Sequence, residues 1–302
     1  MPKFDWDLSP ILFHYPSWLS ILPGEGIRYY SLLYVCVFLG GYRLLDWQIR
    51  RAGGSEDDAN DFVLYGVIAV LAGSRMGHVL FYDFEKFKED PMWLFRIWEG
   101  GLASHGGMLG LTLAMWIFTK LRRQSFVEGS DRFAFSAGLG ATLVRIGNFF
   151  NSEIVGRATD QTWGVRFLRY DDQYRHPSQI YEVILGLLVM GTLWVADRAL
   201  GREKRPRGVL ISIFFAEYFT GRFFVEYFKE YQTLQPGDSY FGFTEGQWLS
   251  IIPALVGYVG LFVAFQKKIP AKWNVYTLPP QPPTDDTTDG DDDVDDVLLD
   301  KR

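Results

Sequence analysis

Nearly every ionisable residue inside the chain's apolar segments falls near the same end of its segment. These residues are Arg75, His105, Arg145, Glu153, His176, Glu182, Arg222 and Glu226. A charged side chain at the centre of a membrane costs about 2.5 kcal/mol or more and usually faces a partner or a wet cavity. Arginines accompanied by carboxylates are suited to bind an anion, because the ion pair fixes the direction of the guanidinium. The pattern predicts one buried anion site near one membrane face, where the nearest anion is a lipid phosphate.

The elements that must position these residues are long, mostly apolar segments. Each is long enough, or nearly so, to cross a hydrocarbon core as a helix. They lie at 29–44, 62–81, 102–119, 133–150, 178–196, 209–228 and 247–266. The chain is 48% hydrophobic and 17% aromatic, which is a high load. The stretches 106–119 and 183–196 are apolar all round, unlike the helices of a soluble protein. We therefore predict an all-α polytopic membrane protein with seven transmembrane helices.

The loops predict the orientation of these helices. Lysine and arginine are dense in one set of loops, at 43–61, 120–132, 197–208 and 267–273, and sparse in the other, at 1–28, 82–101, 151–177 and 229–246. The positive-inside rule then places the N-terminus outside and the C-terminus in the cytoplasm. The polar positions consequently lie in the outer portions of their helices. We see no separate signal peptide in the first 28 residues.

The chain has a net charge of −6, and the uneven distribution of this charge indicates two domains. The acidity belongs to residues 275–302, where prolines precede a run of aspartates that cannot bury enough apolar surface to fold. We predict a seven-helix membrane domain over 1–274 and a disordered cytoplasmic tail over 275–302. A tail that docks a protein partner is the alternative.

Several kinds of chemistry find no support in the sequence. Cys36 is the single cysteine, which leaves no disulfide framework and no thiolate-rich metal site. The four histidines show no HExxH or paired-ligand spacing, and no glycine cluster forms a phosphate loop. We therefore expect no metal, no nucleotide and no redox cofactor.

The run RIGNFFNSEIVG at 145–156 resembles the signature of the prolipoprotein diacylglyceryl transferases, in which Gly-Arg-x-Gly-Asn-Phe-x-Asn-x-Glu-x-x-Gly is the defining pattern. Only the leading glycine departs, because Val144 stands there. Further patches fit the same family in order and at sensible spacing between about 28 and 266: YSLLY at 30–34, GGLASHGG at 100–107, RHPSQIYE at 175–182, GRFFVE at 221–226 and GQWLS at 246–250.

This resemblance implies a bacterial inner-membrane enzyme. It would move the diacylglyceryl group of phosphatidylglycerol to the thiol of a lipobox cysteine in a prolipoprotein and release glycerol phosphate. Its partners would be phosphatidylglycerol, prolipoprotein signal peptides with a lipobox cysteine and the surrounding membrane lipids, and we expect no nucleic acid. The acceptor brings its own cysteine, so the site needs none.

The resemblance also implies catalytic roles. Arg145 matches the family's lipid-binding arginine and would hold the phosphate of the donor and of the departing glycerol phosphate. Glu153 and Glu226 would pair with Arg222 and Arg145, or one of them would accept a proton. His105 is the leading general base for the thiol, because an imidazole suits that transfer; a structural histidine is the alternative.

The remaining site residues would bind substrate. Asn148 and Asn151 would orient lipid oxygens, and Gly106 and Gly107 would admit a substrate backbone. Arg75 would bind lipid or brace the fold, and the sequence does not separate these roles. The predicted substrate-binding set is Tyr30, Arg75, Gly106, Gly107, Arg145, Asn148, Asn151, Gly156 and Tyr218.

Other interpretations stay open. A single ion pair, such as Arg145–Glu226 or Arg222–Glu153, can simply lock two helices together. A transporter of an anionic lipid or small anion also has buried charges and glycine-rich helices. It predicts polar residues that continue to the cytoplasmic end and an internal repeat, and we find little of either. In an inactive relative, Val144 and Ser152 would mark decay, although both changes spare the polar positions.

Overall fold

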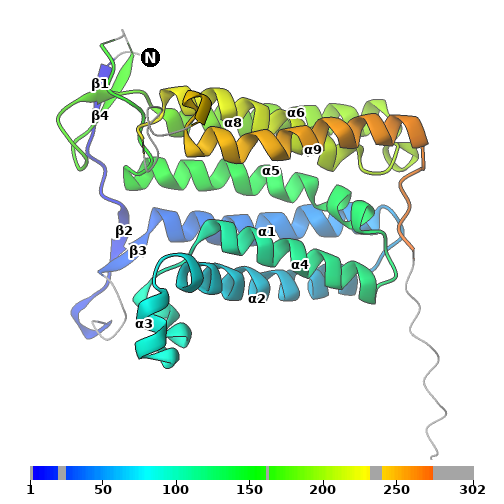
Figure 1. Cartoon of the computed structure of the whole chain (residues 1–302), viewed down its shortest axis with the longest axis horizontal. Helices are drawn as coiled ribbons and strands as arrows, with labels where there is room; N and C mark the ends of the chain where they lie inside the picture. The colour runs from blue at the N-terminus through cyan, green and yellow to red at the C-terminus, as the bar shows by residue number, and fades with distance from the viewer. Residues whose placement is uncertain (1–2, 20–24, 161–162, 232–239, 275–302) are drawn as a thin grey trace, which may run out of the picture.

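A computed structural model describes residues 3–19, 25–160, 163–231 and 240–274, and its long helices run along one axis (Figure 1). Each apolar segment drawn from the sequence forms a helix. These are α1 (Tyr29–Arg50), α2 (Glu56–Phe81), α4 (Ser104–Leu121), α5 (Phe126–Asn151), α6 (Ser178–Ala199), a run of α7 (Val209–Ile213), a π-helical turn (Phe214–Tyr218) and α8 (Phe219–Val225), and α9 (Glu245–Lys267).

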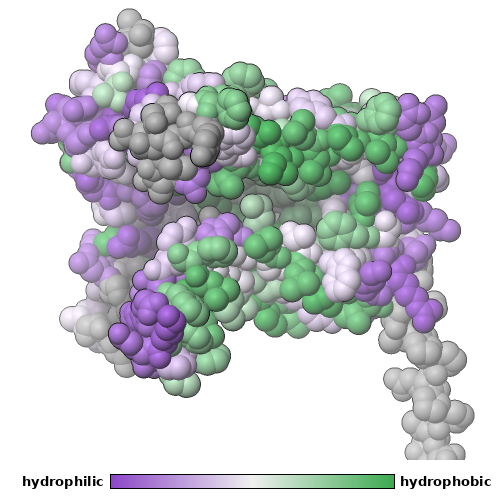
Figure 2. Space-filling view, in the orientation of Figure 1, coloured by the Kyte–Doolittle hydropathy of each residue, from purple (hydrophilic) through white to green (hydrophobic). Residues whose placement is uncertain are grey.

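Within the part of the chain that the structure describes, four helices, α2, α5, α6 and α9, are long and apolar enough to cross a membrane by length and composition. The other predicted segments, α1, α4 and the α7–α8 run, lie alongside them (Figure 1). On the face that Figure 2 shows, apolar residues cover the middle of the bundle and hydrophilic residues gather at its two ends. This distribution is that of a helical membrane protein. Seven crossings and the orientation of the termini stay predictions.

The chain is mostly helical, but the prediction of an all-α fold misses two small sheets. β1 (Lys3–Trp6) pairs in parallel with β4 (Gly164–Phe167), which pairs antiparallel with β5 (Tyr174–Arg175). β2 (Ile11–His14) pairs antiparallel with β3 (Gly26–Arg28). Strands this short carry too few residues for a periodic pattern to reveal them. With the short α3 (Phe84–Glu89), they lie at one end of the bundle (Figure 1).

Close packing of α2 against α4 depends on glycine. Gly73 and Gly77 of α2 face Gly106 and Gly110 of α4, and a Cβ on Gly106 would stand 2.3 Å from the carbonyl oxygen of Gly73. Small residues at such a contact let two helix backbones approach closely. The start of α4 is thereby held against the end of α2.

The opposite end of the bundle is fixed by buried charges. Arg132 and Glu128 of α5 are fully buried and form an ion pair, and Arg205 lies 3.1 Å from Asp131. After α9, residues 268–274 cross this end as a strap, in which the buried Trp273 donates from Nε1 to Asp58. The predicted tail, 275–302, lies outside the described residues.

Candidate active site

Successive long helices run in opposite directions, so the predicted polar positions meet at the end of the bundle that carries the sheets (Figure 1). The ends of α2, α5 and α8 and the starts of α1, α4, α6 and α9 lie there. This is the convergence that the sequence predicts. The side chains then decide which positions form one site.

Glu182, in the first turns of α6, is the centre of that site. Its fully buried carboxylate forms ion pairs with Arg145 of α5, with Arg222 of α8 (3.1 Å, Nη1 to Oε1) and with Lys229 (2.8 Å, Nζ to Oε1). An uncompensated buried charge destabilises a fold by several kcal/mol. The three cations compensate the carboxylate, which in turn fixes the direction in which each cation points.

A second carboxylate extends this group. Glu226 Oε2 lies 3.2 Å from Lys229 Nζ. A Cβ added to Gly246 would stand 2.4 Å from the carboxylate carbon of Glu226, so this carboxylate touches the first turn of α9, where a helix favours negative charge. Burial lowers the pKa of Lys229, and Glu182 acts in the opposite direction. We call Arg145, Glu182, Arg222, Glu226 and Lys229 the charge cluster.

Polar side chains surround Arg145 within the cluster. Its Nη1 donates to Asn148 Oδ1 over 3.1 Å, and its guanidinium hydrogen-bonds with Tyr218. Asn148 also hydrogen-bonds with Tyr30. The Tyr30 ring reaches this position because Gly147 has no side chain, since a Cβ there would stand 2.3 Å from the ring. The structure therefore brings together four of the predicted site residues.

The predicted pairing of the arginines is wrong. The sequence pairs Arg222 and Arg145 with Glu153 and Glu226, whereas the structure pairs both arginines with Glu182. Glu226 instead pairs with a lysine, and the side chain of Glu153 is exposed. The resemblance pointed to Glu182 as part of a motif but gave it no role.

Glu153 follows a break in the chain direction at the end of α5. The helix stops at Asn151, and Ser152 adopts the left-handed conformation (φ 57°), which takes the next residue off the line of the helix. Glu153 then accepts a hydrogen bond from the Asn151 side chain. The left-handed region favours glycine, so Ser152 adopts a conformation that is strained for a residue with a side chain.

Lys229 is the cluster residue that sequence reasoning misses, because it follows the end of an apolar segment and is grouped with a loop. Its place three residues after Glu226 was the available signal, since residues with this spacing share a helix face. Gly156 pairs with Lys229 in an isolated bridge, and Arg157 donates to the Lys229 carbonyl over 2.8 Å. A Cβ on Gly156 would stand 2.3 Å from the carbonyl oxygen of His176, so this contact requires glycine.

His105 lies at the same end of the bundle, in the first turn of α4. Its ring is half-buried against the rings of Phe81 (5.2 Å between centroids) and Tyr82 (5.9 Å). Among the residues that the structure describes, no hydrogen bond or ion pair links His105 to the charge cluster. Gly106 and Gly107 are buried against α2, which supports a role in helix packing.

Arg75 braces the fold. Its guanidinium donates to the carbonyl oxygens of Leu94 (2.9 Å), Gly100 (2.5 Å), Gly101 (3.3 Å) and Trp93 (2.5 Å) and lies 4.1 Å from the centre of the Trp93 ring. These contacts use most of its donors. Of the two roles left open by the sequence, the structure supports bracing of the loop before α4.

The charge cluster is suited to bind a singly charged anion. It contains three cations and two carboxylates, which leaves one positive charge to be compensated. Phosphodiesters carry one negative charge and offer oxygens to guanidinium donors. Across the described ranges, no group of three or more histidine, cysteine, aspartate or glutamate side chains is arranged to hold a metal ion.

Fold and site together define a helical membrane protein with a buried cluster of charged side chains at one end of its bundle. A sequence profile of the family described as prolipoprotein diacylglyceryl transferase matches residues 16–263. The chain belongs to this family, and the resemblance seen in its motifs is confirmed.

Relatives named phosphatidylglycerol--prolipoprotein diacylglyceryl transferase agree. The relative from Pseudoalteromonas atlantica is 37% identical over 260 residues, covering 85% of this chain and 89% of its own. The relative from Chloroherpeton thalassium is 36% identical, covering 85% and 92%, and that from Tolumonas auensis is 34% identical, covering 87% and 98%. These names do not favour the transporter interpretation.

Substitution of Glu182 by glutamine should destabilise the protein. The change leaves Arg145, Arg222 and Lys229 short of their central carboxylate, and breaking a buried ion pair costs about 3 kcal/mol or more. We expect a clearly lower thermal unfolding midpoint in detergent micelles. Glu217→Gln is the control, because Glu217 is partly buried outside the cluster, where it accepts a hydrogen bond from Thr192. Equal midpoints for the two variants would contradict the central role of Glu182.

Proposed function

We propose that this chain transfers the diacylglyceryl group of phosphatidylglycerol to the thiol of a lipobox cysteine in prolipoproteins and releases glycerol phosphate. Membership of a transferase family supports this function. The observation that carries it is the charge cluster, whose surplus of one positive charge matches the single negative charge of the donor's phosphodiester.

In the proposed reaction, the cysteine sulfur attacks the carbon of the diacylglycerol unit that is bonded to the phosphate oxygen. A carbon–sulfur bond forms as the carbon–oxygen bond breaks, and the bonding electrons leave with the phosphate oxygen. The thiol proton goes to a base. Negative charge therefore builds up on the phosphate, where preorganised cations stabilise it most.

The roles of the residues follow from their places. Arg145 holds the phosphate, and Arg222 and Lys229, which pair with the same Glu182, add positive charge near that anion. Tyr30, Asn148 and Tyr218 form hydrogen-bonding walls, and Asn151 orients lipid oxygens. Glu226 keeps Lys229 in position. His105 is the proposed base, and the neighbouring rings of Phe81 and Tyr82 support its side chain.

The direct test is an assay with purified protein. We would incubate the chain with phosphatidylglycerol and a lipobox peptide and detect a thioether-linked diacylglyceryl adduct by mass spectrometry. A peptide with serine in place of the cysteine is the control. If the folded protein forms no adduct, the proposed function is wrong.

We propose a topology with seven crossings in the bacterial inner membrane, with the N-terminus outside, the C-terminus in the cytoplasm and the site towards the outer leaflet. The dense lysine and arginine of one set of loops support this orientation. A reporter that is active only outside should be active when fused near residue 90, and a cytoplasmic reporter when fused near residue 204. The reverse pattern would remove the site from the outer leaflet.

Arg145 should not tolerate lysine. A planar guanidinium can donate to Glu182, Asn148 and a phosphate together, whereas an ammonium is a point charge that cannot keep this geometry. We expect Arg145→Lys and Arg145→Ala to lose most transfer activity, about 100-fold or more if a preorganised donor is lost. Near-normal turnover by Arg145→Lys would reduce this residue to a generic positive charge.

The test of His105 separates a base from a binding residue. His105→Gln keeps a polar side chain of similar reach but cannot accept the thiol proton at neutral pH. We expect near-normal binding of phosphatidylglycerol, slow transfer at neutral pH and partial recovery as the pH rises past about 8.5, where the peptide thiol ionises by itself.

Lost lipid binding without recovery at high pH would make His105 a binding or structural residue. The base would then lie among Glu153, Glu226 or bound water.

A further inference from the structure

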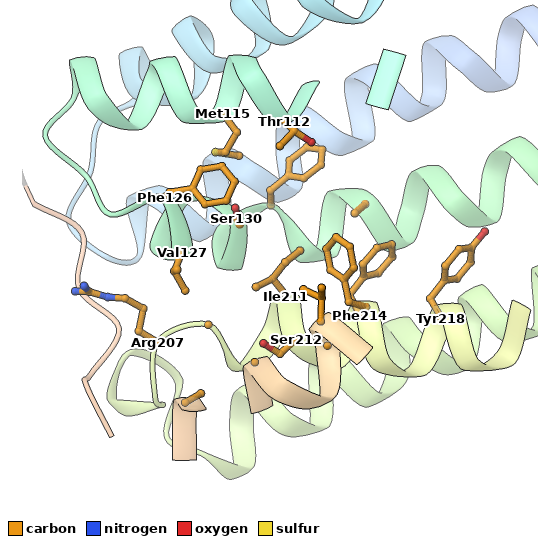
Figure 3. Close-up of a pocket in the computed structure, with 18 of the residues that line it drawn as sticks. Thr112, Met115, Phe126, Val127, Ser130, Arg207, Ile211, Ser212, Phe214 and Tyr218 are labelled. Carbon is orange, nitrogen blue, oxygen red and sulfur yellow. The ribbon is translucent and has the colours of Figure 1, made fainter. Parts of the chain in front are cut away.

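A cavity of about 850 Å³ lies among α4, α5, the α7–α8 run and α9 (Figure 3). Its walls are mostly apolar side chains, with Met115 on α4, Phe126 on α5 and Phe214 on the π-helical turn among them. Figure 2 shows the surface hollowed between α4 and α9, the two helices that border the cavity on this face. The cavity is therefore a large apolar space that opens on the surface between α4 and α9.

One end of the cavity reaches the charge cluster through Tyr218. Tyr218 lines the cavity and hydrogen-bonds with Arg145. Its ring stacks on that of Phe214, with 5.3 Å between the centroids and an angle of 6° between the planes. Both residues belong to the π-helical turn, a feature often found at functional sites. A ligand whose phosphate binds at Arg145 could thus extend the rest of its structure past Tyr218 into the cavity.

The cavity is deep. Along α5 its lining residues run from Gly140 down to Phe126, the first residue of the helix. At 1.5 Å per residue, Phe126 lies roughly 28 Å below Arg145. One leaflet of a bilayer accounts for only about 15 Å of hydrocarbon. A chain that extends from the phosphate position would therefore cross the middle of the membrane while it still contacts the lining residues of the cavity.

A hydrocarbon chain is the occupant that this lining fits. A peptide in the same space would need partners for its backbone N–H and C=O groups, and apolar walls do not supply them. An acyl chain has no such groups, and each methylene gains by leaving water. Met115, Phe126 and Ser130 lie close together on the side of the cavity away from Tyr218, with Val127 and Arg207 farther out (Figure 3), and we call the first three residues the floor.

We propose that the cavity holds an acyl chain of the diacylglyceryl donor and that the floor sets the longest chain that the enzyme uses efficiently. This inference rests on the proposed function. A chain shorter than the cavity binds freely, whereas a longer one meets the floor and must bend or withdraw. Because protein interiors are closely packed, a bulkier floor should shorten the accepted chain.

The test compares two donors in mixed micelles with the same lipobox peptide: dilauroyl-phosphatidylglycerol, which has short chains, and distearoyl-phosphatidylglycerol, which has long ones. Ser130→Phe fills the floor and should lower kcat/KM for the long donor about tenfold while the short donor keeps its rate. Phe126→Ala enlarges the floor and should shift the preference towards the long donor.

The control is Gly191→Phe on α6, where an added Cβ would meet nothing within 4 Å. This variant should treat both donors like the unchanged protein. Should Ser130→Phe fail to fold, Ser130→Leu introduces a smaller side chain at the same place. We then expect a smaller decrease in kcat/KM for the long donor.

Equal slowing of both donors by a folded Ser130 variant, or no change in their ratio, overturns the inference while the proposed function stands. Absence of transfer by the unchanged protein with either donor overturns the proposed function itself. A preference that shifts in opposite directions in Ser130→Phe and Phe126→Ala supports the floor as the determinant of chain length.

Discussion

The structure of the candidate site depends on one buried carboxylate. Glu182 is fully buried, so it needs cations around it, and α5, α8 and the segment that follows α8 each supply one: Arg145, Arg222 and Lys229. Because each cation comes from a different part of the chain, the same charge that requires compensation ties these parts together. Helix packing and anion binding thus rest on one set of contacts.

The sequence predicts much of the fold because a membrane imposes simple rules. A span must satisfy its backbone internally and present apolar side chains, and each of the predicted segments is a helix. The helix boundaries are less accurate. α2 begins at Glu56, before the predicted 62, because Ser55 and Asp58 form a capping box, and α5 begins at Phe126, before the predicted 133. A segment drawn from hydropathy ends at the first charged residues, whereas α2 and α5 continue through such residues.

The site is predicted in part for a similar reason. Depth along each helix follows from counting residues, so the sequence finds the common end of Arg145, Arg222 and Glu182. Which carboxylate meets which arginine depends on helix rotation and on the conformation of one residue at the end of α5. Neither leaves a pattern in the sequence. Glu153 follows the left-handed Ser152 and is exposed, and Glu182 pairs with the two arginines instead.

A carboxylate at the centre of an anion site is at first sight unfavourable, because it repels the ligand. Its value lies in the charge that it leaves. With Glu182 and Glu226 present, the three cations have one unit of charge to spare, which matches a phosphodiester. The departing phosphate monoester carries nearly two negative charges at neutral pH. Three uncompensated cations would hold such a product more tightly than the donor, whereas the surplus of one charge leaves it only partly neutralised. On the proposed function, the buried carboxylates therefore favour release of the product, a step that limits turnover in many enzymes.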